Sequence, residues 1–190
     1  LAPKTSARQA GLLRDVPFDV LRTMIAGSIE AFLRDELPRY ENIGTQVILS
    51  ISGSEPVHYA EIAELVGDDP RIAALEMNLS CPNVGSGLPF SSDPQLLYDT
   101  VRQTRQRTTL PLYAKLSPNV TDIRVSCRAA EDAGADALTL SNTFRAMTID
   151  IQKRRPYLGN LSGGMSGPAI KPVAVRMVYQ VANAVKLPII

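Results

Sequence analysis

A chain of 190 residues with 45% hydrophobic and 21% charged residues can bury a sizeable core, and it is typical of one soluble globular domain, residues 1–190. The net charge of +1 gives no electrostatic reason to expect nucleic acid or an anionic membrane as a partner. Apolar runs such as residues 46–51 are too short to span a membrane, and the first residues lack a signal-peptide core, so we expect a cytoplasmic protein. Two cysteines, Cys81 and Cys127, make no disulfide framework, and the sequence has no zinc-type Cys/His spacing, so no metal site is predicted.

The apolar pattern predicts alternating helices and strands. Helical spacing over residues 20–37 predicts a first helix that ends at Pro38. Strands are expected at residues 45–52, 73–79, 112–116 and 137–140, and another begins at 188. Helices are expected at residues 59–66, 94–107, 122–133 and 169–185, and residues 144–167 are expected to be irregular. Asp93 and Asp122 stand at helix N-cap positions and Gly134 at a helix C-terminus, so two of these helices carry local end signals.

This alternation, without a hairpin signal between strands, predicts an α/β fold with a parallel sheet. A closed (β/α)8 barrel and an open doubly wound sheet both fit the pattern. A G-x-G-x-x-G motif does not follow any predicted strand, which disfavours a dinucleotide-binding fold. Because the chain stops within the apolar run 187–190, we expect it to be a fragment.

Polar side chains follow each predicted strand, where the carboxyl ends of parallel strands would meet. The set is rich in amides and hydroxyls, includes one lysine and lacks a carboxylate pair, so glycoside hydrolysis is not expected. His58 lies far from Cys81 in the sequence, and we interpret it as an ordinary surface residue rather than the partner of a nucleophile. The strand-end residues are Ser50, Ser52, Asn78, Ser80, Cys81, Asn83, Lys115, Ser117, Asn119, Ser141, Asn142 and Thr143.

Lys115 stands in an apolar strand, where an ammonium group is costly to bury without an anionic partner. A barrel mouth lined by amides and one lysine suits a planar, hydrogen-bonding ligand such as a flavin, whose reduced ring carries negative charge. The glycines of residues 163–168 precede a helix, so they either let backbone N–H groups approach a ligand or form a plain connector.

These residues lie in motifs that resemble the class 1 dihydroorotate dehydrogenases, and the resemblance extends from about residue 30 to residue 190. The motifs are residues 77–83 (MNLSCPN), 113–122 (YAKLSPNVTD), 141–143 (SNT) and 162–172 (SGGMSGPAIKP). The last two resemble the NAD-linked subtype, which is type B-like and pairs with an iron–sulfur/FAD electron-transfer subunit.

The resemblance implies a (β/α)8 TIM barrel, incomplete at both ends, that holds FMN at its mouth and oxidises dihydroorotate to orotate in pyrimidine biosynthesis. Cys81 would be the general base, with hydride transfer to FMN. A homodimer core is also implied. The residues implied for FMN are Ser50, Asn78, Lys115, Ser141 and Gly167, and those implied for substrate are Asn78, Asn83, Asn142 and Thr143.

Two departures from the family pattern accompany these motifs. Ser50 stands where the family has a flavin-contacting asparagine, and the Asn-rich substrate loop is not recognisable around residues 24–28. A dihydropyrimidine dehydrogenase-like flavin domain is an alternative, but its acid–base cysteine is expected farther along the loop, and residues 87–93 contain none. A catalytically inactive barrel fragment is the other alternative.

Overall fold

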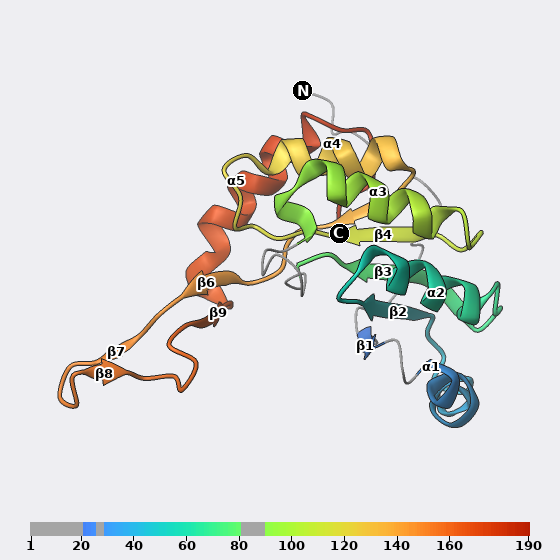
Figure 1. Ribbon diagram of the computed structural model, residues 1–190, viewed down its shortest axis with the longest axis horizontal. Coiled ribbons are helices and arrows are strands. Elements are labelled where there is room, and N and C mark those ends of the chain that lie inside the picture. Colours follow the sequence, from blue (N-terminus) through green and yellow to red (C-terminus); the bar gives the residue numbers. More distant parts are fainter. Residues whose placement is uncertain (1–20, 26–28, 81–89) are drawn as a thin grey trace.

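The core of the protein is one parallel β-sheet of five strands with the order β1-β2-β3-β4-β5. The structure is a computed structural model that describes residues 21–25, 29–80 and 90–190 (Figure 1). All neighbouring strands pair in parallel. The strands are β1 (Leu21–Ile25), β2 (Val47–Ser52), β3 (Ile72–Asn78), β4 (Leu112–Lys115) and β5 (Ala137–Thr139).

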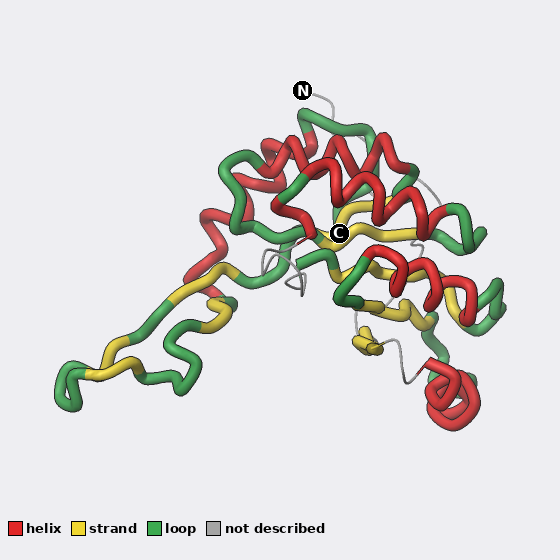
Figure 2. The backbone as a smooth tube through the Cα atoms, viewed as in Figure 1, coloured by secondary structure: helices red, strands yellow, loops and turns green. Residues whose placement is uncertain are grey.

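Helices connect the strands and cover one face of the sheet (Figures 1 and 2). The principal helices are α2 (Pro56–Val66), α3 (Pro94–Arg105), α4 (Ile123–Ala133) and α5 (Lys171–Ala182). Shorter helical segments are α1 (Ile29–Ala31), η2 (Phe32–Glu36), η3 (Leu37–Tyr40), η4 (Phe90–Ser92) and η5 (Pro168–Ile170).

The strand order distinguishes the two architectures that the sequence left open. A doubly wound sheet reverses its strand order at a switch point and carries helices on both faces. Here the order rises without reversal, as in an arc of a (β/α)8 barrel. After β5 the chain passes through α5, and Ile189 forms a parallel bridge with Leu138, which starts the next strand beside β5. The predicted barrel fold is therefore confirmed.

The two faces of the sheet differ in the size and polarity of their side chains. The face toward the helices carries large apolar groups such as Leu49, Leu75 and Met77, which belong to the main core cluster. The opposite face, which is the inside of a barrel, holds a smaller cluster of Ala74, Tyr113 and Ala137. Strand register places Ser50, Asn78 and Lys115 on this inner face as well, because register partners and residues two apart point the same way.

The predicted helix caps are present. The Asp93 carboxylate accepts hydrogen bonds from the backbone N–H groups of Gln95 and Leu96, and Asp122 accepts one from Arg124. Gly134 ends α4 at a φ of 99°, a left-handed conformation that a residue with a side chain rarely adopts. Local chemistry therefore sets the ends of α3 and α4.

The predicted helix over residues 20–37 is wrong. Residues 21–25 form β1, which pairs along its length with β2 (for example Thr23 with Ser50), and only residues 29–40 are helical. The apolar spacing fits either state over five residues, and the free edge of β2 decides in favour of the strand. Pro38 does not end the helical backbone, because it lies in the first turn of η3, where its missing N–H group is tolerated.

Residues 144–167 are more regular than predicted. They form an extended arm (β6, β7, β8 and β9) that begins at the carboxyl end of β5 and returns to α5 (Figure 1). Its strands pair antiparallel, β6 with β9 and β7 with β8, so the sequence concealed a ribbon that lacks a hairpin signal. The strands are β6 (Phe144–Ala146), β7 (Ile149–Asp150), β8 (Arg155–Pro156) and β9 (Gly163–Met165).

Candidate active site

The inner face of the sheet changes from apolar to polar toward the carboxyl ends of the strands. Ala74, Tyr113 and Ala137 form an apolar cluster, and two positions farther along the same strands Glu76, Lys115 and Thr139 carry carboxylate, ammonium and hydroxyl groups. Such an edge is where parallel α/β barrels hold their ligands. Of the strand-end groups predicted from the sequence, Ser50, Asn78 and Lys115 therefore lie at one edge of the sheet.

Glu76 is the centre of this polar layer and is 2% exposed. Its Oε1 accepts hydrogen bonds from Ser50 Oγ at 3.3 Å and from Lys115 Nζ at 3.2 Å. Its Oε2 accepts one from Thr139 Oγ1 at 2.9 Å. One carboxylate on β3 thus connects side chains from β2, β4 and β5.

The anionic partner expected for Lys115 is therefore supplied by the chain itself. Sequence reasoning looked for that anion in a bound ligand and missed Glu76. The signal was present, because Glu76 is the single carboxylate in the apolar run 73–79, and a buried charge needs a partner. Sequence spacing did not indicate that the partner would come from the next strand.

A second set of hydrogen bonds joins β3 to the loop after β5. Asn142 Nδ2 donates to Asn78 Oδ1 at 3.0 Å, and Asn142 Oδ1 accepts from the backbone N–H of Thr143 at 2.7 Å. Asn78 is also the register partner of Lys115. The structure therefore brings together Asn78, Lys115, Asn142 and Thr143, with Ser50 connected to them through Glu76.

Asn119 was expected among the strand-end residues but received no role toward a ligand, and it connects two loops at this edge. Its Nδ2 donates to Ser117 Oγ at 3.1 Å and to the carbonyl of Thr143 at 3.0 Å, and its Oδ1 accepts from the backbone N–H of Arg145 at 2.9 Å. Asn119 thereby holds the loop after β4 against the base of the arm.

Two residues of α2 support the site from behind. The Tyr59 hydroxyl donates to the carbonyl of Asn78 at 2.8 Å, and its ring packs edge-on against Phe90. His58 is half-buried, and its Nδ1 accepts from the backbone N–H of Ser54 at 3.3 Å, so it closes the turn after β2. This local hydrogen bond gives His58 a turn-closing contact, and its interpretation as an ordinary surface residue is not contradicted.

Cys81 and Asn83 lie outside the described residues. The chain on either side of that segment is fixed at the polar edge, because the backbone N–H of Ser91 donates to the carbonyl of Leu79 at 3.0 Å. Ser91 is buried, and its Oγ accepts from the backbone N–H of Ser117 at 3.1 Å. The roles given to Cys81 and Asn83 stay predictions.

The two other predicted residues have different surroundings. Ser141 is adjacent to Asn142, and its Oγ donates to the carbonyl of that residue at 3.0 Å, so it belongs to the same loop. Gly167 lies farther along the chain, between β9 and η5, with a φ of 78° that favours glycine. Their roles toward FMN also stay predictions.

The buried thiol of Cys127, outside this polar layer, does not suggest a second reactive centre. Burial raises the pKa of the Cys127 thiol to about 12, with smaller contributions from Asp122 and Glu131, which fits the predicted packing role. Within the described part of the chain, His, Cys, Asp and Glu side chains do not gather in a group of three that could hold a metal ion. The helices of that same part are too short or too polar to cross a membrane.

The fold and the polar edge define a barrel protein with a candidate ligand site at the carboxyl ends of its strands. Residues 23–190 match the family model described as dihydroorotate dehydrogenase. This chain belongs to the dihydroorotate dehydrogenase family.

Similar proteins agree with this assignment. The chain is 54% identical over 163 residues to the protein of Desulforudis audaxviator named "Dihydroorotate dehydrogenase B (NAD(+)), catalytic subunit", and 51% identical to the protein of that name from Geotalea uraniireducens. In each case 85% of this chain is covered but 53% of the relative, so the chain spans about half the length of these curated relatives.

Solved structures show the same fold. A ligand-free DHODH from Eimeria tenella superposes with a TM-score of 0.59 at 21% identity, and the match covers 87% of this chain and 52% of that one. The ferulenol complex of DHODH from the same organism gives a TM-score of 0.57. At this identity the likeness concerns the fold alone.

Proposed function

We propose that this protein is the FMN-dependent dihydroorotate dehydrogenase of pyrimidine biosynthesis, which oxidises dihydroorotate to orotate. Family membership and the type B names of the similar proteins support the proposal. The observation that carries it is the Lys115 ammonium, which is held by Glu76 beside the carboxamides of Asn78 and Asn142. A cation and hydrogen-bonding amides at a barrel mouth suit a flat ligand that gains negative charge.

The described residues fit FMN by the chemistry of their donors. Glu76 takes one of the three N–H donors of Lys115, and the ammonium remains partly exposed at the mouth. We propose that Ser50, Asn78, Lys115, Ser141 and Gly167 contact FMN. When bound, FMN would supply the acceptor of the hydride from C6 of dihydroorotate.

The chain itself would bind the pyrimidine and move one proton. Asn78, Asn83, Asn142 and Thr143 would hold the ring and its carboxylate, and the hydrogen bond between Asn78 and Asn142 already orients two of these amides. Cys81 would remove the proton from C5. A free thiol titrates above neutral pH, so this base needs a polar environment that favours its thiolate.

The electrons would leave through a second subunit. The similar proteins are called catalytic subunits of an NAD(+) enzyme, which supports an iron–sulfur/FAD electron-transfer partner that passes electrons to NAD. We also propose a homodimer core, supported by exposed apolar side chains on the arm, and a cytoplasmic location, supported by a free buried thiol at Cys127.

The test uses the natural full-length protein, purified with any partner subunit. We expect flavin absorbance and oxidation of dihydroorotate, and we expect Cys81→Ser to lower kcat by about 100-fold or more, because a general base contributes at least that factor. Cys127→Ala is the matched control and should keep the wild-type rate. A protein without flavin would refute the proposed function, whereas full activity in Cys81→Ser would refute the cysteine base alone.

A further inference from the structure

We propose that Glu76 is a positioning residue that holds the Lys115 ammonium at the barrel mouth, ready for the ligand. The ion pair between Glu76 and Lys115, here called the tether, is a property of the described residues. Its purpose rests on the proposed function. Glu76 belongs to none of the residues that the family motifs suggested for FMN or substrate, so it adds a second layer to the site.

The carboxylate of Glu76 is held in place by two hydroxyl groups in addition to the lysine. Ser50 Oγ donates to Oε1 from β2, and Thr139 Oγ1 donates to Oε2 from β5, so hydroxyls on both sides set the rotation of the carboxylate. The side chain is buried, so bulk water does not compete for these oxygens. Glu76 therefore offers Lys115 a stationary acceptor.

Lys115 needs such an acceptor because its side chain is long and flexible. The ammonium is carried by a flexible four-carbon side chain. Without a partner it would extend toward water, as lysines at the edge of an apolar region usually do. Its side chain is 25% exposed, against 3% for that of Glu76. The salt bridge of 3.2 Å thus restrains the ammonium where the polar edge meets the mouth.

Stability alone is a poor reason for this ion pair. Transfer of two charges out of water costs about as much as their attraction returns, and apolar residues of similar volume often stabilise a core equally well or better. The inner-face cluster beside it is in fact largely apolar and consists of Ala74, Tyr113 and Ala137. A charged pair next to this cluster, with the Lys115 side chain partly exposed, is explained by what it presents to a ligand.

A double-mutant cycle in the natural full-length protein tests the proposal. The variants are Glu76→Gln, Lys115→Met and the pair together, and the control is Glu64→Gln, which removes an exposed carboxylate from α2. We expect Glu76→Gln to raise the FMN dissociation constant of the apoprotein, and to slow flavin reduction, by about tenfold or more, the lower end of the effect that loss of a ligand-orienting partner has at metal sites. In the Lys115→Met background the same change should have less than about a twofold effect, because contacting residues in one network are not additive. If the fold-changes of the two single variants multiply in the double variant, the two residues act independently and the proposal is wrong.

Two substitutions at Thr139 distinguish a positioning role of Glu76 from a general loss of packing. Thr139→Ser keeps the hydroxyl that holds Glu76, so it should retain wild-type FMN affinity, whereas Thr139→Val removes the hydroxyl at nearly the same volume and should weaken it. Equal loss in both variants would mean that packing at β5, rather than the hydrogen bond to Glu76, controls the site.

A measurement on the apoprotein tests the contact between Glu76 and Lys115 in the absence of FMN. Reductive ¹³C-methylation preserves the charge of lysines, and Lys115→Met identifies the resonance of Lys115 by NMR. We expect a restrained Lys115 signal in the wild-type apoprotein and a sharp, mobile one in Glu76→Gln. An unchanged signal would overturn the tether. If the protein binds no FMN while the signal does change, the proposed function fails and the tether stands.

Discussion

The two cysteines illustrate how residue type alone leaves a role undecided. Cys127 is buried in α4, and burial raises the pKa of its thiol to about 12, so thiolate is scarce at neutral pH. We predict that iodoacetamide modifies Cys127 only after denaturation, as measured by peptide mass spectrometry of native and guanidinium-treated protein. Cys81, the proposed base, is expected to react in the native protein. Modification of Cys127 under native conditions would contradict the packing role.

Gly164 matters because of the side chain beside it. It lies in β9 opposite Arg145, and a Cβ atom there would lie 2.8 Å from Thr143 Cβ and overlap the Thr143 hydroxyl. We predict that Gly164→Ala displaces Thr143 and raises the KM for dihydroorotate about tenfold, the equivalent of one lost hydrogen bond, with a smaller effect on kcat. Gly159→Ala, which meets no atom within 4 Å, is the control for steady-state kinetics. An unchanged KM would remove Thr143 from the substrate site.

At the scale of the element, local signals predicted the helix ends well. Asp93, Asp122 and Gly134 act within one turn of their own position, so the sequence contains the whole cause. β1 was mistaken for a helix because its state depends on β2, far along the chain. The arm was missed for the same reason, since β6 finds its partner in β9.

The cap of α4 should make stability depend on pH. Hydrogen bonds from Arg124 lower the pKa of the Asp122 carboxyl from 3.8 to about 2. The folded state therefore binds the proton less tightly than the unfolded state, so the stabilisation is complete above about pH 4 and is lost as the pH falls toward 2. We predict that the stability difference between wild type and Asp122→Asn, from urea denaturation, is constant above this range and shrinks within it. Asp132→Asn, an exposed site on the same helix, is the control, and a difference that grows on acidification would contradict the assignment.

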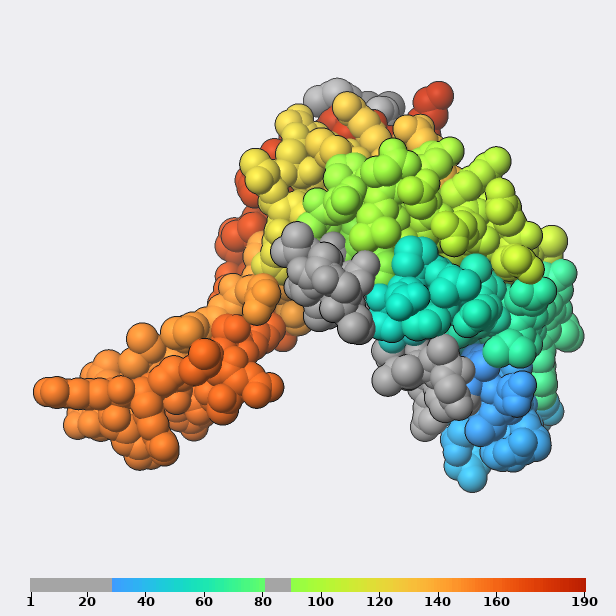
Figure 3. Space-filling model, in the orientation of Figure 1, coloured from blue at the N-terminus to red at the C-terminus, as the bar shows by residue number. Residues whose placement is uncertain are grey.

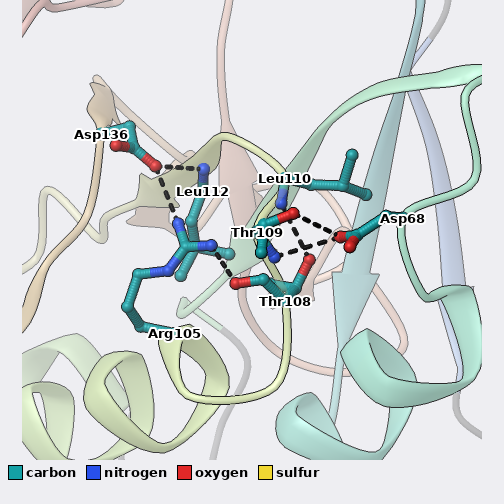
Figure 4. Close-up of polar contacts among 7 residues, drawn as sticks. All are labelled: Asp68, Arg105, Thr108, Thr109, Leu110, Leu112 and Asp136. Carbon is teal, nitrogen blue, oxygen red and sulfur yellow. Dashed lines mark hydrogen bonds and ion pairs between the residues drawn. The ribbon is translucent and has the colours of Figure 1, made fainter.

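The opposite edge of the sheet has a network that serves stability (Figure 4). Asp136 Oδ2 accepts from the backbone N–H of Leu112, the first residue of β4, at 2.8 Å and from Arg105 Nη1 at 3.0 Å. Arg105 also donates to the carbonyl of Thr108. We predict that Asp136→Ala lowers the free energy of unfolding by about 1–3 kcal/mol, because two donors lose their acceptor.

Urea denaturation measures this loss. Asp136→Asn keeps an acceptor oxygen and should lose less. Both variants should keep the wild-type kcat, because Asp136 lies at the amino ends of the strands, away from the polar layer. A fall in kcat without a fall in stability would contradict the structural role.

For the whole molecule, the sequence predicted the strand-end residues but not the contacts between them. Asn78, Lys115 and Asn142 were found because each lies at or shortly after the end of its own strand. Glu76 was overlooked because its role comes from Ser50, Lys115 and Thr139 on three other strands, and sequence spacing does not report lateral pairing. A single domain over residues 1–190 stays a prediction.

The arm gives the proposed homodimer a surface. It stands clear of the sheet and helices (Figure 3), and Ile151, Tyr157 and Leu161 are 79%, 73% and 60% exposed. A two-fold dimer uses the same patch on both subunits, so exposed apolar side chains on an arm that packs on little of its own chain suit a second copy.

We therefore predict that Ile151→Asp in the natural full-length protein shifts a dimer toward monomers in sedimentation velocity. A buried carboxylate without a partner disfavours association far more than the lost apolar area alone. Val125→Asp introduces the same charge at an exposed apolar position on α4 and should leave the dimer intact. If Ile151→Asp stays dimeric and instead loses the co-purified electron-transfer subunit, the arm binds that subunit and the dimer must form through another surface.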